Sequence, residues 1–115
     1  MNVVHAAPTD LVSEQLSVKR LTDELGATKL RANVWTLAEG TMLKHTHREQ
    51  EELYLVLDGV MQLEVEGTLH RLGERDAAVV PAGAEHRAVN TGRGPVTFVV
   101  MAAPNVTGDA EIDRG

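Results

Sequence analysis

Four side chains that commonly bind metal ions lie in the central and downstream parts of the chain. His45 and His47 are separated by one residue, Glu52 follows soon after them, and His86 comes much later. Successive side chains of an extended strand point to opposite faces, so His45 and His47 would project from the same face and could reach one ion. This pair is the first indication of a metal site.

Glu52 opens the apolar run Leu53–Leu57, which has strand composition and is closed by the turn dipeptide Asp58-Gly59. The odd spacing from His47 would place Glu52 on the wrong face of one continuous strand. We therefore expect a turn within residues 48–51 that resets the register and lays the second strand antiparallel beside the first. Two histidines and one carboxylate with open positions suit a redox-active or Lewis-acidic first-row metal.

The spacing of these residues is also compatible with a structural interpretation in which none of them binds a metal. An isolated exposed histidine is usually a solvated polar residue, and Glu51 and Glu52 could be ordinary surface charge. Spacing by itself does not decide between the two readings.

Composition limits the class of protein and its partners. The 115 residues are enough for one small domain with one core. The 11 basic and 17 acidic residues give a net charge of −6, which argues against nucleic acid or an anionic membrane as partner. The chain has no cysteine, so a metal site would use nitrogen and oxygen ligands. Without a leader pattern or a long apolar run, we expect a soluble cytoplasmic protein.

The hydrophobic pattern predicts many short strands and no convincing helix, typical of an antiparallel sandwich or barrel. We expect residues 1–27 to be an N-terminal arm with a possible short strand near 18–21 and a turn at 22–26. Residues 28–103 would form the β-barrel domain, and residues 104–115 a flexible acidic tail. Strands such as Leu53–Leu57 are apolar on both faces, so the outer face needs a cover, and we predict a homodimer.

Two stretches resemble the motifs of the cupins, a superfamily of small antiparallel jelly-roll barrels also described as double-stranded β-helices. The first cupin motif, G-x(5)-H-x-H-x(3,4)-E-x(6)-G, is matched by Gly40, His45, His47, Glu52 and Gly59, with one residue fewer between Gly40 and His45. The resemblance implies an all-β cupin fold for most of the chain.

The second cupin motif, G-x(5)-P-x-G-x(2)-H-x(3)-N, is matched by Pro81, Gly83, His86 and Asn90 with every spacing kept. Arg75 stands where the motif has its leading glycine, which affects the local backbone of a turn outside the ligand set.

Residue by residue, the resemblance implies that His45, His47, Glu52 and His86 hold one divalent transition metal per chain: iron, manganese, nickel, zinc or copper. Three neutral imidazoles and a carboxylate leave one or two positions of such an ion open to water or a chelating substrate. Each imidazole should donate its second N–H to an acceptor that orients it. Because only neutral histidine coordinates, metal should be released as the pH falls.

Other candidate site residues carry weaker signals. Tyr54 shares the face of Glu52 and is either a hydrogen-bond donor inside the barrel or a core tyrosine. Arg87 and Arg31 could bind a substrate carboxylate, although a solvated side chain is the reading that we favour for both. Trp35 is either a pocket wall or core.

Two further polar residues are read as structural. His70 has no partner at chelating spacing, which favours a surface residue. Asn90 is interpreted as a residue that forms a turn and not as a ligand.

The function expected from this pattern is that of a metal-dependent enzyme of dioxygenase type, acting on a small oxygen-rich metabolite. A redox-neutral isomerase or lyase would need a general base beside the substrate, and Tyr54 and Glu51 are poor bases at ordinary pKa. The alternative from another class is a non-catalytic module that binds a small metabolite through the metal.

Overall fold

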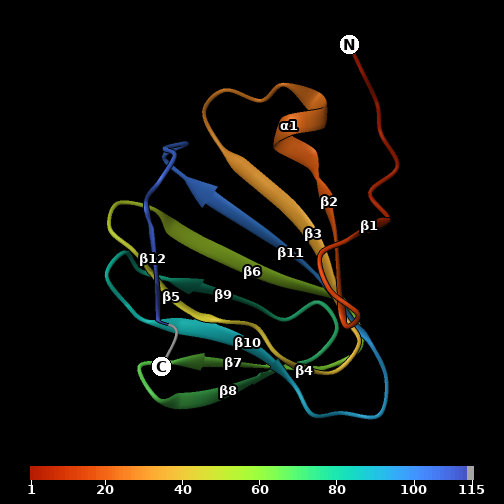
Figure 1. Cartoon of the computed structure of the whole chain (residues 1–115), viewed down its shortest axis with the longest axis vertical. Helices are drawn as coiled ribbons and strands as arrows, with labels where there is room; N and C mark the ends of the chain where they lie inside the picture. Colours follow the sequence, from red (N-terminus) through yellow and green to blue (C-terminus); the bar gives the residue numbers. More distant parts are fainter. Residues whose placement is uncertain (114–115) are drawn as a thin grey trace.

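Most of the chain forms two antiparallel β-sheets in the computed structural model, which describes residues 1–113 (Figure 1). The first sheet has the order β1-β2-β3-β11-β6-β9, with β1 Asp10–Leu11, β2 Leu16–Arg20, β3 Arg31–Leu37, β11 Val96–Ala103, β6 Glu51–Asp58 and β9 Ala77–Val80. The second has the order β12-β5-β10-β7-β8, with β12 Ala110–Asp113, β5 Lys44–His47, β10 His86–Asn90, β7 Met61–Val65 and β8 Thr68–Leu72. β4 Gly40–Thr41 pairs with β10.

From β5 onward the chain passes repeatedly from one sheet to the other. β5 lies in the second sheet, β6 in the first, β7 and β8 in the second, β9 in the first, β10 in the second and β11 in the first. This alternation is that of a double-stranded β-helix, so the predicted all-β jelly roll is confirmed.

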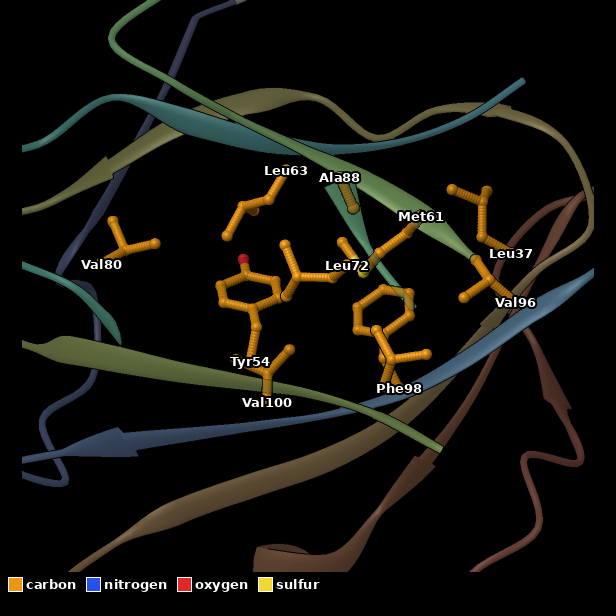
Figure 2. Close-up of a cluster of buried hydrophobic side chains, with 11 residues drawn as sticks. Leu37, Tyr54, Met61, Leu63, Leu72, Val80, Ala88, Val96, Phe98 and Val100 are labelled. Carbon is orange, nitrogen blue, oxygen red and sulfur yellow. The ribbon is translucent and has the colours of Figure 1, made fainter. Parts of the chain in front are cut away.

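The hydrophobic core lies between the two sheets. Figure 2 shows Tyr54 and Phe98 of the first sheet pointing toward Leu63 and Met61 of the second. Strand β6 alternates between half-buried or exposed and buried positions, as expected of a strand with one face on the core. Phe98 is fully buried at the centre of this cluster. The core thereby holds the two sheets at a fixed separation.

A short helix replaces the turn expected at residues 22–26. α1 Leu21–Leu25 follows β2 directly and ends at Gly26, whose φ of 72° is the left-handed conformation typical of a helix C-terminus. Thr22 of α1 accepts a hydrogen bond from Ala32 N at 2.6 Å, so the helix is fastened to β3. The expectation of no helix was wrong because one turn is too short to show periodicity. In residues 1–113 no helix has the length and apolar character needed to cross a bilayer.

The segment after Pro104, expected to be a flexible tail, contains a paired strand. Residues 110–113 form β12, which runs antiparallel to β5 with Ala110 opposite His47 and Ile112 opposite His45. At the other end of the chain, β2 pairs with β3 along its whole length. Both sheets therefore include strands from outside the range 28–103 expected for the barrel. The sequence prediction missed β12, whose four residues are all exposed.

Candidate metal centre

The four predicted ligands come from three strands in two sheets. His45 and His47 lie on β5, and His86 lies on the neighbouring β10, where it is directly opposite His45. Glu52 lies on β6 in the facing sheet. The donor atoms of the four side chains all lie within 4.8 Å of one another. The structure therefore brings together residues that are up to 41 positions apart (86 − 45).

The connection between His47 and Glu52 differs from the one predicted. A turn does interrupt the strands, since β5 ends at His47 and β6 begins at Glu51. The predicted side-by-side pairing of these strands is wrong, because β5 belongs to the second sheet and β6 to the first. Glu52 thus meets the imidazoles across the interior, where the inward face of β6 opposes that of β5.

One oxygen of Glu52 is the point on which the three imidazoles converge. Its Oε1 lies 2.6 Å from His86 Nε2, 3.2 Å from His47 Nε2 and 3.5 Å from His45 Nε2. The group is shielded from solvent, because Glu52 is 7% exposed and His86 2% exposed. All three histidines present the same ring nitrogen, which leaves each Nδ1 free for a second partner.

Two of the three histidines use a backbone carbonyl as that second partner. His86 Nδ1 lies 2.9 Å from Ala84 O, and His45 Nδ1 lies 3.2 Å from Leu43 O. In a neutral imidazole, an N–H donated from Nδ1 to a carbonyl leaves Nε2 unprotonated and able to coordinate a metal ion. These contacts supply the orienting acceptors that the sequence could not name.

The loop before His86 is tied to the first pair of histidines. Gly83 N donates to His47 O at 2.8 Å, and Ala84 N donates to Pro81 O at 3.2 Å. Gly83 has a φ of 87°, a conformation that glycine adopts at little cost. The turn of the second motif therefore fixes the position of His86 relative to β5.

The electrostatics of the cluster favour a negatively charged Glu52 and raise the pKa of His45. Burial by itself would raise the pKa of Glu52, but hydrogen bonds from His45, His47 and His86 outweigh it and hold the pKa far below its usual range. For His45, burial would lower the pKa, while the hydrogen bonds to Glu52 and Leu43 raise it, with a net increase. The charged carboxylate is the form that binds a cation.

A cavity of about 590 Å³ opens onto this cluster. Three ligands line it, namely His45, His47 and Glu52, and most of the remaining lining is apolar. The further lining residues are Val12, Ser13, Leu16, Arg31, Asn33, Trp35, Thr41, Met42, Leu43, Gln50, Tyr54, Phe98, Val100, Ala102, Ala110 and Ile112. A ligand in this space would reach the point where the donors meet.

Comparison with known proteins agrees with this fold. Residues 33–102 match the family described as the cupin domain. The chain belongs to the cupin family.

Solved structures and a curated relative extend the likeness of this cupin. A protein of Silicibacter pomeroyi, described as a sugar phosphate isomerase from a cupin superfamily, is 30% identical, with a TM-score of 0.78, over 89% of this chain and 68% of that one. The polyketide cyclase RemF of Streptomyces resistomycificus has a TM-score of 0.80 at 23% identity, covering 97% of this chain and 84% of that one, which is a likeness of fold alone.

The curated relative is a mannose-1-phosphate guanylyltransferase of Klebsiella pneumoniae, 29% identical over 75 residues, or 65% of this cupin. The chain spans only 16% of that protein's length. The match therefore concerns one part of a much larger protein.

The four residues could hold one metal ion, as in other cupins. Donor atoms bound to one first-row ion at about 2.1 Å lie roughly 3–4.2 Å from one another, and the four donor atoms here all lie within 4.8 Å of one another. Three imidazoles and one carboxylate are also a donor set that such ions accept. Within residues 1–113 one buried side-chain atom, His47 Nδ1, lacks a hydrogen-bond partner. The hydrogen-bonding capacity of the cluster is therefore not fully used.

Tyr54 lies in the site, whereas Arg87 lies outside it. Tyr54 is buried, its hydroxyl lies 3.5 Å from Glu52 Oε1, and its ring meets the His86 ring edge-on. Burial, followed by the charge of Glu52, raises the pKa of Tyr54 well above its usual value. Arg87 does not line the cavity and donates to Glu64 Oε2 at 2.6 Å.

Trp35 and Arg31 both line the cavity. Trp35 also packs against the hydrophobic core, so both predicted readings describe part of its surroundings. Arg31 is half-buried, donates to Asn105 Oδ1 at 3.3 Å and lies 3.9 Å from Asp23. The structure thus places Arg31 where a ligand could touch it.

The two polar residues that were read as structural have structural surroundings. Asn90 is buried, and its amide donates to Leu37 O, Ala38 O and Gly94 O, which ties the turn after β10 to the end of β3. His70 is exposed on β8, away from the donor cluster.

Sequence reasoning missed two buried polar residues next to the ligands, Gln50 and Asp109. Gln50 lies in the turn that was predicted, but its side chain gave no sign of burial. Asp109 lies in the expected tail, and the only available signal was the alternation of Ala-Glu-Ile-Asp at 110–113, which is typical of a strand.

Proposed function

We propose that this cupin is a metal-dependent enzyme of dioxygenase type, whose substrate is a small metabolite with chelating oxygens and an apolar body. The observation that carries the proposal is that the convergent donors face a largely apolar cavity. A divalent ion bound there would supply Lewis acidity and, for iron, manganese, nickel or copper, redox chemistry with oxygen.

The cavity lining supports the redox branch over proton transfer. Among the described lining residues Glu52 is the single carboxylate, and it is committed to the donor cluster. Tyr54 is a poor base because its pKa is raised. A reaction that moves a proton within the substrate needs a positioned base with a pKa near the working pH. The lining offers no such group apart from the ligands themselves.

The rim of the cavity supports an apolar substrate body. Val12, Leu43 and Ile112 line the cavity and are 49%, 54% and 47% exposed, respectively. They come from three separate segments: the β1–β2 loop, the β4–β5 connection and β12. An apolar group of a bound substrate would cover all three and remove this surface from water.

A redox-neutral isomerase is the second candidate. It is supported by the 30% identity with the Silicibacter pomeroyi protein described as a sugar phosphate isomerase and by Arg31, the single arginine or lysine among the described lining residues. Arg31 could bind a phosphate or carboxylate group.

A non-catalytic metabolite-binding module remains the alternative from another class. A cytoplasmic location and the absence of nucleic-acid or membrane partners remain predictions from the sequence.

The test begins with elemental analysis of the purified protein, followed by loading with Fe(II), Mn(II), Ni(II) or Zn(II). Oxygen uptake is measured with catechols, flavonols and β-diketones, and isomerisation of sugar phosphates is measured without oxygen. We expect oxygen uptake with at least one chelating substrate. We also expect Glu52→Gln to lower metal affinity by about 100-fold or more, because it replaces the anionic ligand by a neutral amide, and a change in a ligand costs more than a change in the group that supports it.

The matched control is His70→Gln, which changes an exposed histidine of β8 and should leave metal content and turnover unchanged. Turnover of sugar phosphates without oxygen would favour the isomerase. Ligand-dependent thermal stabilisation without any turnover would favour the binding module.

A further inference from the structure

His47 is the one predicted ligand whose second ring nitrogen has no hydrogen-bond partner among the described residues. His45 and His86 direct Nδ1 at backbone carbonyls, at 3.2 and 2.9 Å. His47 Nδ1 is buried and unpaired, and the carboxylate oxygen Oδ2 of Asp109 lies 3.7 Å away. Since a ligating imidazole normally donates its other N–H to an acceptor, Asp109 is placed to complete the set.

Asp109 is itself held in place by the turn that separates His47 from Glu52. Its Oδ2 accepts hydrogen bonds from Gln50 N at 2.9 Å and Glu49 N at 3.1 Å, and its Oδ1 accepts from Glu49 N at 3.0 Å. Asp109 is 6% exposed. A buried carboxylate with these donors keeps a fixed position and can orient the side chains beside it.

The surrounding segment anchors Asp109 from both sides. The Gln50 side chain donates to Pro104 O at 2.9 Å, and Arg48 donates to Gly108 O at 2.9 Å. Directly after Asp109, β12 pairs with β5 and sets Ala110 opposite His47. The chain after β11 therefore contacts both the strand that carries His45 and His47 and the turn that follows it.

We propose that Asp109 is a positioning residue of the metal centre, a role that rests on the metal binding proposed above. Its carboxylate holds the 48–50 turn and accepts the Nδ1–H of His47, so that His47 Nε2 faces the ion. The present separation of 3.7 Å is longer than a hydrogen bond, and a small rotation of the imidazole toward the ion would close it. Asp109 is not one of the four candidate ligands and does not line the cavity.

The experiment measures Co(II) binding by its visible absorption and by competition with a chromophoric chelator. We expect Asp109→Asn to weaken Co(II) binding about 10- to 100-fold, the effect typical of losing an acceptor behind a ligating histidine. Asparagine keeps an oxygen for the turn N–H groups but loses the charge that favours His47 donation. The Co(II) spectrum at saturation should also change, because the His47 ring is no longer held.

Glu111→Gln is the matched control. Glu111 lies on β12 two residues from Asp109, is exposed, and is 3.9 Å from the equally exposed Arg48. A surface pair of this kind contributes little, so Co(II) affinity should stay within about twofold of the unchanged protein. Asp109→Glu provides a second variant that keeps the charge and should bind Co(II) more tightly than Asp109→Asn.

The outcomes separate this inference from the proposed function. If the unchanged protein binds no Co(II), the metal centre itself fails. If it binds and Asp109→Asn binds equally well with the same spectrum, then Asp109 only caps the turn, and the positioning role is overturned. Unfolding of the chelator-treated variants, followed by circular dichroism, shows whether a loss of affinity reflects a loss of fold.

Discussion

At the scale of residues, the centre depends on which nitrogen each histidine presents. Three Nε2 atoms face Glu52 Oε1, and two Nδ1 atoms are held by carbonyls two residues earlier in the chain. Without a metal, the cluster is held together by proton sharing between imidazole and carboxylate. A metal ion competes with those protons for the same lone pairs.

This competition predicts opposite pH dependences for the stability of the metal-free protein and for the stabilisation that a metal ion adds. The pKa of His45 is raised from its ordinary value of 6.5. Its contribution to the stability of the metal-free protein is therefore fully present below about pH 6.5 and is lost as the pH rises through the raised pKa. The Tm of chelator-treated protein should fall between pH 6 and 9, whereas the added stabilisation by Zn(II) should grow over the same range.

Circular dichroism melts of the metal-free protein at half-unit pH steps test this prediction. His45→Gln should flatten the fall in Tm, and His70→Gln should retain it. The pKa of Glu52 is lowered, so its contribution is lost only at acid pH, below its ordinary value of 4.5. A metal-free Tm that rises from pH 6 to 9 would contradict the assignment.

At the scale of elements, the departure from the second motif has a visible consequence. Arg75 occupies the position of the motif glycine and has a φ of 67°, the left-handed conformation that glycine adopts freely. The turn is nevertheless formed, because Arg75 N donates to Val56 O at 2.8 Å and Asp76 N donates to Gly73 O at 3.0 Å. The backbone of the motif is kept at the cost of strain in one residue.

Restoring the glycine should therefore stabilise the protein. We expect Arg75→Gly to raise the free energy of unfolding by about 0.5–1 kcal/mol, since the left-handed strain of roughly 1–2 kcal/mol exceeds the added entropy of the unfolded glycine. For a domain of this size, Tm should rise by about 2–5 °C. Arg75→Ala is the control, because it removes the side chain and keeps the strain. A lower free energy of unfolding in urea for Arg75→Gly than for the unchanged protein would refute this explanation.

At the scale of the whole molecule, the outer face of the first sheet carries an apolar row across three strands. Met101 of β11 lies opposite Leu53 of β6, which lies opposite Val79 of β9. Val79 is 55% exposed and Met101 39% exposed, and Leu30 beside them is 45% exposed. These residues line a shallow groove of about 160 Å³.

We propose that a second copy of the chain covers this row, in line with the homodimer predicted from the sequence. A twofold axis through the row would set the same apolar residues against each other, which is the commonest form of closed assembly. Light scattering after size exclusion should give the mass of a dimer. Val79→Lys combined with Met101→Lys should shift it to that of a monomer.

Leu69→Lys is the control for the dimer prediction. Leu69 is 57% exposed on β8 of the other sheet, so its replacement should leave the mass unchanged. A monomeric mass for the unchanged protein would remove the proposed interface. A dimer unaffected by the double substitution would place the interface elsewhere.

The strands, the ligand types and the family were predictable from the sequence because each depends on neighbours along the chain. Apolar strand composition marks β6, alternation marks β7, and the spacing of His45 and His47 determines a shared face. The motif spacing identified Glu52 and His86. None of these inferences required knowing which strands pair.

The tertiary structure decided the features that join residues far apart in the chain. Three residues connect β5 to β6, and a connection of that length is compatible with two arrangements. β6 could pair with β5 in one sheet, or it could lie in the facing sheet, as it does here. Asp109 reaches Glu49 across 60 residues, and no local pattern encodes that contact. The cavity arises in the same way, because it exists only where separate segments close on one another.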